Sequence, residues 1–148
     1  MEKSEFYCCT YVSSAVTPFS ETELSDLLIQ SRDSNAKYNI TGMLLYAEGH
    51  FIQVLEGRKL DVITLMDNIQ RDARHHNVCI IKLSELANRQ FPDWTMGYQT
   101  IDLNEISELV HGFSLFMMQN PLAGVPWIAP NDCQRLLDAF RLNHLFLR

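Results

Sequence analysis

Gln53 stands on a strand-like segment whose other residues are mostly apolar. The segment 50–57 reads His-Phe-Ile-Gln-Val-Leu-Glu-Gly, and strand alternation places Phe51 and Leu55 on the same face as Gln53. A buried primary amide has two N–H donors and an acceptor oxygen, and leaving one unpaired costs about 1–3 kcal/mol. Gln53 therefore needs a partner, which is either a backbone carbonyl or water, or the polar edge of a bound ligand.

Other polar side chains fall where they would converge on this strand. They are Tyr11 on the first expected strand, and Ser31, Ser34, Asn35, Asp72, Arg74 and His75 toward the ends of two expected helices. Each also has a structural explanation, such as a core tyrosine, a helix C-cap amide or a cation matched to a helix dipole. The end of the second expected helix carries Arg74 and His75 and is basic in an otherwise acidic chain. It is either a solvated terminus or a site for the phosphates of a nucleotide cofactor.

Alternation and helical spacing predict a βαββαβ order followed by one more strand. The expected strands span 6–13, 39–46, 50–57, 78–83 and 94–100; one helix runs from a capping box at Ser20 and Glu23 to about 33–34, and a second from after Gly57 to about 74–76. This order predicts an α+β, ferredoxin-like fold, with two helices on one face of a sheet. A groove between those helices would accept a flat ligand that rests on the sheet.

The chain changes character after residue 101. Residues 104–118 have the spacing of a helix, prolines interrupt 121–130, and Asn131 or Asp132 is expected to cap a last helix. We therefore divide the chain into a ligand-binding domain at 1–101 and a helical extension at 102–148. The extension is expected to pack on the open face of the sheet or to form a subunit contact.

Composition excludes several classes of function. The 148 residues are 47% hydrophobic, enough for one core, and the net charge of −6 argues against nucleic-acid binding. No apolar run approaches the ~18 residues of a membrane span, and the charged N-terminus lacks a signal peptide, so a cytoplasmic location is expected. The four cysteines, Cys8, Cys9, Cys79 and Cys133, lack the spacing of a zinc site, and no metal is expected.

Five motifs in sequence order match a known family. They are Tyr11, Ser34-Asn35 ahead of Asn39-Ile40-Thr41-Gly42, Phe51 to Gly57, Asp72-Ala73-Arg74-His75, and Phe91-Pro92-Asp93-Trp94-Thr95-Met96. With this order and spacing, residues 6–100 resemble the BLUF domain, a blue-light sensor that uses a flavin. The family's fold is the ferredoxin-like one expected above, with FAD between the two helices. FMN is the alternative cofactor.

The resemblance implies a photochemical pair. Tyr11 would donate an electron and a proton to the excited flavin, and Gln53 would lie between Tyr11 and the N5 and C4-carbonyl edge of the ring. Its amide suits a relay, because one end donates and the other accepts. Rotation or tautomerisation of the amide would then give a small, reversible red shift of absorption. Trp94 and Met96 match a pair that exchanges places near the glutamine.

The resemblance also implies the residues that hold the cofactor. Asn35 would bind the C4-carbonyl and N3 side of the ring, and Ser34 would lie near the C2 carbonyl, at a position that is often Asn or His in relatives. Asp72, Arg74 and His75 match positions near the ribityl chain and phosphates. The remaining expected contacts are Ser31, Phe51 and Ile69.

The function expected from the resemblance is that of a switch and not of an enzyme. The light signal would pass through the C-terminal helices to a downstream signalling protein or to another copy of the chain in a homo-oligomer. Two alternatives stay open at this stage. One is a small ferredoxin-like flavin enzyme or haem enzyme, with His75 or His76 as an axial ligand, and the other is a dimerisation module without a cofactor.

Overall fold

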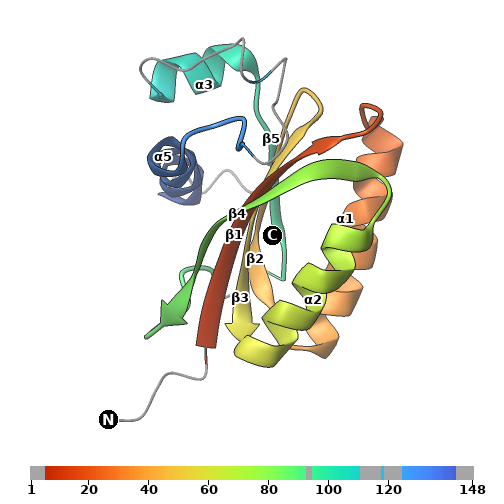
Figure 1. The fold of residues 1–148 in the computed structure, drawn as a ribbon, viewed down its shortest axis with the longest axis vertical. Helices are drawn as coiled ribbons and strands as arrows, with labels where there is room; N and C mark the ends of the chain where they lie inside the picture. The colour runs from red at the N-terminus through yellow and green to blue at the C-terminus, as the bar shows by residue number, and fades with distance from the viewer. Residues whose placement is uncertain (1–5, 93–94, 111–117, 119–124, 143–148) are drawn as a thin grey trace.

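A five-stranded sheet with helices on both faces forms the body of the protein (Figure 1). The computed structural model describes residues 6–92, 95–110, 118 and 125–142. The elements in chain order are β1 (Phe6–Ala15), α1 (Glu21–Lys37), β2 (Thr41–Ala47), β3 (His50–Arg58), α2 (Lys59–Arg71), β4 (His75–Leu86), β5 (Gly97–Thr100), α3 (Leu103–Leu109) and α5 (Pro130–Leu142). The predicted βαββαβ order with one further strand, and the α+β class, are confirmed.

The strand order places the two residues of greatest interest side by side. The sheet runs β4-β1-β3-β2-β5, with β5 parallel to β2 and the other neighbours antiparallel. Tyr11 of β1 lies opposite Gln53 of β3, and Leu44 of β2 lies opposite Gln53 on the other side. The predicted neighbourhood of Tyr11 and Gln53 is therefore confirmed.

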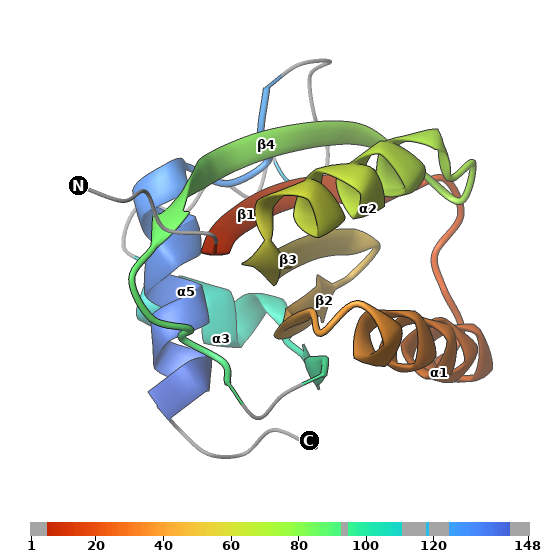
Figure 2. The ribbon, with the colours of Figure 1, turned by 90° about the horizontal axis from the view of Figure 1, so that it is seen from below.

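Both faces of the sheet are covered (Figure 2). Helices α1 and α2 lie on one face, where their apolar side chains pack with Tyr11, Phe51 and Leu55. On the opposite face, side chains of α3 and α5 pack with Ile52 and Val54. The described residues of the C-terminal segment thus include side chains that pack on this face of the sheet.

Helix α1 starts where the sequence predicts and ends later. The Ser20 hydroxyl accepts from the Glu23 amide at 3.1 Å and the Glu23 carboxylate accepts from the Ser20 amide at 3.1 Å, which is the predicted capping box. The expected end at 33–34 is wrong, because the helix continues to Lys37. Asn39 carries the positive φ of 54° that often follows a helix, and Asn35 lies in the last turn of α1, ahead of the C-cap residue Tyr38.

Helix α2 ends earlier than the sequence predicts. It stops at Arg71, and Asp72 is already extended, with ψ of 118°. His75 and His76 therefore do not belong to a helix terminus, since they begin β4, which is also longer than the predicted 78–83. The acidic side chain of Asp72 binds Arg74 across this corner, and this local contact favours the turn over another helical turn.

Three elements in the C-terminal third differ from their predicted bounds. The strand expected at 94–100 begins only at Gly97, and Trp94 lies outside the described residues. The helix expected at 104–118 runs from Leu103 to Leu109, with Val110 extended after it, and 111–117 lie outside the described residues. The last helix begins at Pro130, close to the predicted cap. Within the described part of the chain, no helix has the length and hydropathy to cross a membrane.

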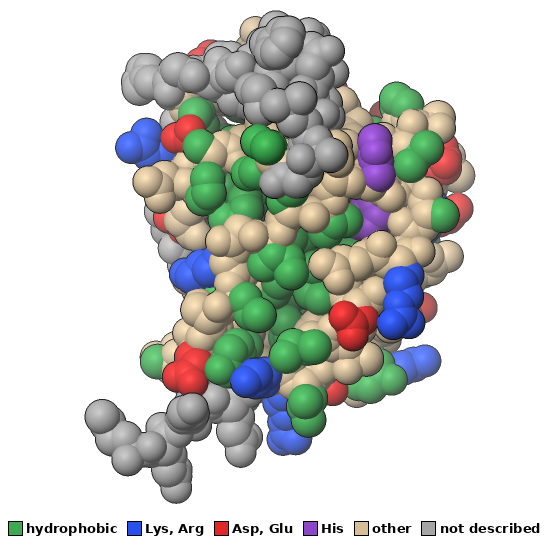
Figure 3. Space-filling view, in the orientation of Figure 1, with side chains coloured by type: hydrophobic (Ala, Val, Ile, Leu, Met, Phe, Trp, Pro, Cys, Tyr) green, Lys and Arg blue, Asp and Glu red, His purple; other side chains and the backbone are tan. Residues whose placement is uncertain are grey.

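Strand β4 forms one edge of the sheet and exposes apolar side chains. Ile80 and Leu83 are 47% and 48% exposed. Figure 3 shows apolar side chains gathered along the middle of this face of the molecule. A cavity lies on the side of the sheet that carries α1 and α2, away from α3 and α5.

Gly42 is required where β2 passes close to β3. A Cβ at this position would lie 1.9 Å from the carbonyl oxygen of Val54, which is backbone and cannot yield without moving β3. At Gly57 the nearest atom is the side-chain Cγ1 of Ile40 at 3.1 Å, which would have to shift by only a few tenths of an ångström. Side chains at the two glycines should therefore be tolerated very differently.

We predict that Gly42→Ala lowers the free energy of unfolding by about 3 kcal/mol, the cost of forcing atoms into a packed site. Gly57→Ala is the matched control and should cost clearly less. Urea unfolding followed by circular dichroism measures both. Equal losses in the two variants would contradict the close approach of β2 and β3.

Candidate functional site

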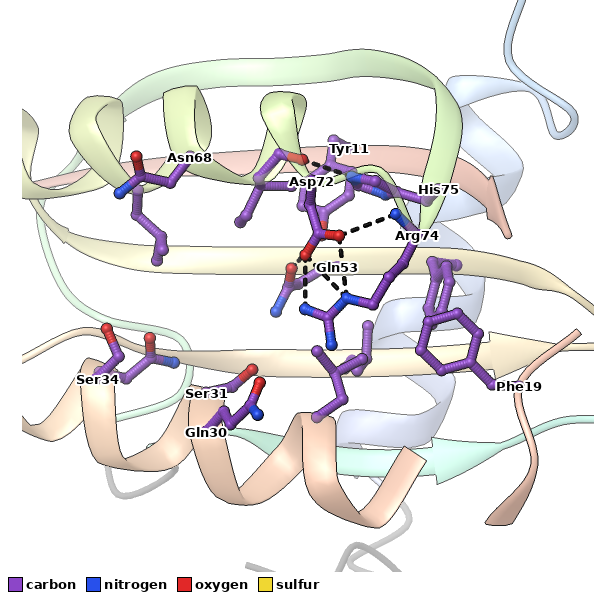
Figure 4. Close-up of a pocket in the computed structure, with 16 residues that line it drawn as sticks. Tyr11, Phe19, Gln30, Ser31, Ser34, Gln53, Asn68, Asp72, Arg74 and His75 are labelled. Atoms are coloured by element: carbon purple, nitrogen blue, oxygen red, sulfur yellow. Dashed lines mark hydrogen bonds and ion pairs between the residues drawn. The ribbon is translucent and has the colours of Figure 1, made fainter. Parts of the chain in front are cut away.

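A cavity of about 220 Å³ opens between α1 and α2 above the sheet (Figure 4). It contains all ten residues expected to contact a cofactor, namely Tyr11, Ser31, Ser34, Asn35, Phe51, Gln53, Ile69, Asp72, Arg74 and His75. The sequence predicts these residues on two strands and toward the ends of two helices. The fold brings them to one place, in the groove between the two helices that the order of elements predicts.

Three buried side chains form a hydrogen-bonded chain that begins at the cavity floor, which Tyr11 and Gln53 line. The Tyr11 hydroxyl donates a hydrogen bond to Oε1 of Gln53, and Nε2 of Gln53 donates to Sδ of Met96 at 3.5 Å. All three residues are at most 6% exposed. Partners within the protein thus engage both ends of the Gln53 amide, and Gln53 also lines the cavity.

Burial keeps Tyr11 protonated. Removal of the phenol from water raises its pKa far above the ordinary value, and the nearby Cys9 and Asp72 add to this shift. A phenolate is therefore not accessible in the resting protein at neutral pH. The phenol proton stays available for donation to Gln53.

Helix α1 contributes the polar wall of the cavity. Ser31, Ser34 and Asn35 line it, and Figure 4 shows the two serines on the side of α1 that faces the sheet. Asn35 is 2% exposed, and its Nδ2 donates to the carbonyl oxygen of Thr95 at 2.8 Å. Asn35 therefore joins the cavity wall to the segment just before β5.

The corner between α2 and β4 places an ion pair at the cavity. Arg74 Nε donates to both carboxylate oxygens of Asp72, at 2.9 and 3.1 Å, and its Nη2 lies 2.5 Å from Oδ2. Hydrogen bonding from Arg74 lowers the pKa of the Asp72 carboxyl. The Arg74 guanidinium points into the space between the helices (Figure 4), where a cation is suited to an anionic group.

His75 closes one end of the floor. Its Nε2 donates to the carbonyl oxygen of Ile69 at 2.5 Å, and its Nδ1 lies 2.9 Å from the hydroxyl of the buried Ser13. The ring packs edge-on against Tyr11 and Phe51. Both ring nitrogens are engaged within the protein, which argues against the alternative of a haem ligand at His75.

The cavity has further walls that the sequence analysis did not identify: Phe19, Leu27, Gln30, Leu44, Leu65 and Asn68. Helical spacing could have identified four of them, because each precedes an expected site residue by one helical turn. Leu27 and Gln30 precede Ser31 and Ser34, and Leu65 and Asn68 precede Ile69 and Asp72. Phe19 lies in a loop, where no periodicity identifies it.

Glu56 has a role that the sequence analysis also missed. Its side chain is fully buried, and its carboxylate accepts from the backbone amides of Gln90 and Phe91 at 2.8–2.9 Å. Arg89 adds bonds from the same loop to Thr41 Oγ1 and to the carbonyl oxygen of Glu56. These contacts fasten the loop at 89–91 to β3, a few residues before Met96.

The chemistry of the cavity suits a flavin. Its floor offers aromatic and apolar side chains such as Phe51 and Leu44 to a flat ring, and Gln53 and Asn35 place amides beside them. Amides match the alternating carbonyls and nitrogens of a flavin edge, since each both donates and accepts. Arg74 supplies the charge that phosphates need. The residues present therefore fit the group.

A family model confirms this class of protein. The model of the BLUF family, sensors of blue-light using FAD, matches residues 6–97. The chain therefore belongs to the BLUF family of flavin-binding blue-light photoreceptors. The resemblance predicted from the five motifs is confirmed.

Curated relatives place the same module in larger proteins. The chain is 36% identical over 95 residues to a photoactivated adenylate cyclase subunit beta of Euglena longa and 37% identical to that of Euglena gracilis. Each match covers 64% of this chain and 11% of the relative. The chain thus corresponds to about a tenth of the length of these relatives.

Solved structures agree over nearly the whole chain. BlrB, a BLUF protein in its dark state, is 26% identical with a TM-score of 0.71, covering 96% of this chain and 99% of that one. The photo-activated state of BlsA is 25% identical with a TM-score of 0.71, covering 93% and 95%. A bacterial light-regulated adenylyl cyclase is 29% identical with a TM-score of 0.62, covering 93% and 35%. The ferredoxin-like fold is thereby confirmed.

We predict that Glu56→Gln lowers the free energy of unfolding by about 2 kcal/mol, because an amide replaces a charged acceptor and brings donors that face the amides of Gln90 and Phe91. Hydrogen exchange of those two amides should accelerate. Glu48→Gln, at an exposed turn position, is the control. If both variants unfold at the same urea concentration, Glu56 does not hold the loop.

Proposed function

We propose that this chain binds FAD in the cavity between α1 and α2 and acts as a reversible light switch centred on Tyr11 and Gln53. The hydrogen bond from Tyr11 to Gln53 on the cavity floor carries the proposal. Ser31, Ser34, Asn35, Phe51 and Ile69 would hold the ring, and Asp72, Arg74 and His75 the ribityl chain and phosphates. FMN would use the same ring contacts.

When bound and excited by light, a flavin would supply a one-electron acceptor, and Tyr11 would give up an electron reversibly. Tyr11 holds its proton in the dark, because burial raises its pKa, and releases it only when oxidised. Gln53 Oε1 is in place to take that proton, and a nitrogen of the bound ring beside Gln53 would accept the proton that Nε2 gives up. When the proton returns, the amide is left rotated or tautomerised, and donor and acceptor have exchanged positions.

The same geometry supports a switch in preference to an enzyme. The electron and the proton both return to Tyr11, so nothing is consumed. In the relatives, a BLUF-like segment occupies only about a tenth of a protein named as a cyclase, which is consistent with a sensing module distinct from the output. We therefore assign the sensing role to residues 1–101 and the relay to the extension at 102–148.

The output would pass to a partner protein or to a second copy of the chain. Gln53 is flanked in β3 by Ile52 and Val54, which pack on the opposite face with residues of α3 and α5. A rearranged amide can therefore bias the packing of these helices. Trp94 and Met96 would take part as the exchanging pair, and the contact of Met96 with Gln53 supports this role for Met96.

We predict that the purified protein is yellow and that blue light shifts its flavin band reversibly to the red. Tyr11→Phe removes the donor hydroxyl, and Gln53→Leu removes the relay, so each should keep the flavin and lose the shift completely. Absorption spectra in the dark and after illumination measure this. A Soret band, or an intact shift in either variant, would refute the assignment.

We also predict that light changes the assembly of the protein. Scattering or size-exclusion profiles of the dark and illuminated full chain, alone and with candidate partners, should differ. Tyr11→Phe is the control, because it should absorb light without switching. Identical profiles in both states for every mixture would contradict an output through protein contacts.

A further inference from the structure

The segment just before β5 delivers a side chain to the photochemical pair. Thr95 and Met96 precede the first residue of β5, Gly97. Met96 is 1% exposed, and its Sδ is the acceptor for Nε2 of Gln53 at 3.5 Å. The position of this short segment therefore decides whether Gln53 has a partner on this side.

Two side chains of α1 hold the segment by its backbone. The half-buried Arg32 donates from both Nε and Nη2 to the carbonyl oxygen of Met96, at 3.1 and 3.0 Å. Asn35, three residues further on the same face of the helix, donates to the carbonyl oxygen of Thr95 at 2.8 Å. Two consecutive carbonyls are thus fixed, and hydrogen bonds from a guanidinium are stronger than neutral ones.

The contact between Met96 and Gln53 depends on the orientation of the amide. A thioether sulfur is a weak acceptor and has no proton to donate. It is satisfied when Nε2 faces it and Oε1 faces Tyr11, as observed. If the amide rotates, Oε1 faces the sulfur and neither atom can donate. Met96 therefore favours the observed orientation over the rotated one.

We propose that Arg32 is a positioning residue that holds Met96 against Gln53 and thereby speeds the return from the light-induced state. This inference rests on the proposed Tyr11–Gln53 switch. Arg32 would act on the switch through the Met96 carbonyl. The Met96 side chain is flexible, because it has three rotatable bonds. Fixing its backbone limits how far its sulfur can move away from Gln53.

The kinetic test compares Arg32→Met with Lys37→Met in the flavin-loaded full chain. Both changes remove one cation from α1, but Lys37 is exposed. After illumination, dark recovery of the absorption shift should be about threefold slower in Arg32→Met, the size expected for losing one weak hydrogen bond. Lys37→Met should recover like the parent, and Arg32→Lys, which keeps a donor, should lie between. Equal rates in Arg32→Met and Lys37→Met would overturn the proposal.

A second measurement reads the position of Met96 without any light. The ¹³C-labelled methionine methyl resonance of Met96, assigned with Met96→Leu, should move in Arg32→Met toward the shift of a freely rotating methionine. It should not move in Lys37→Met. An unchanged resonance in Arg32→Met refutes the positioning role even if the photocycle itself proves different from the one proposed.

The double variant shows whether Arg32 acts through Met96. In the Met96→Leu background, Arg32→Met should slow recovery no further, because the contact that it positions is already gone. A full additional slowing there would mean that Arg32 acts by another route. Absence of any red shift in the parent protein would instead refute the Tyr11–Gln53 switch, and the methyl resonance alone would then test Arg32.

Discussion

The hydrogen bond from Tyr11 to Gln53 is the interaction on which the site depends. It requires that β1 and β3 be neighbours in an antiparallel register that sets the two residues opposite each other. It also requires a dry floor, which Phe51 and Leu44 help to provide. Burial then keeps the phenol protonated, so the orientation of the Gln53 amide has a defined donor on one side.

The framework around this pair is held mainly by contacts to backbone atoms. Glu56 binds the amides of the loop at 89–91, and Asn35 and Arg32 bind the carbonyls of Thr95 and Met96. The segment between β4 and β5 is thus tied to β3 at one end and to α1 at the other. A change in the orientation of the Gln53 amide can therefore act directly on this segment through the contact with Met96.

Much of the fold and the site follows from local patterns. Alternation in β1 and β3 predicted the two faces of the sheet, the Ser20 capping box predicted the start of α1, and the order of elements predicted that Tyr11 lies beside Gln53. These features depend on residues near one another in sequence or on topology alone. The ten expected cavity residues came together for that reason, although several were assigned only by resemblance.

The errors occur where distant side chains decide the local structure. The strand expected at 94–100 starts late, and just before it α1 binds the carbonyls of Thr95 and Met96. The basic helix end predicted at His75 is an exception, because the turn found there is held by a local contact between Asp72 and Arg74. Glu56 looked like a strand end, and its carboxylate is satisfied by amides 34 and 35 residues away. No window of sequence contains such pairs.

Gln53 and its two chain neighbours connect the two faces of the sheet over a very short distance. Their side chains alternate, so the amide faces the cavity while Ile52 and Val54 face the C-terminal helices. The cavity and the C-terminal helices are therefore separated by the thickness of a single peptide layer. A change in the twist of β3 would therefore alter the packing of α3 and α5 directly, with no hinge between them.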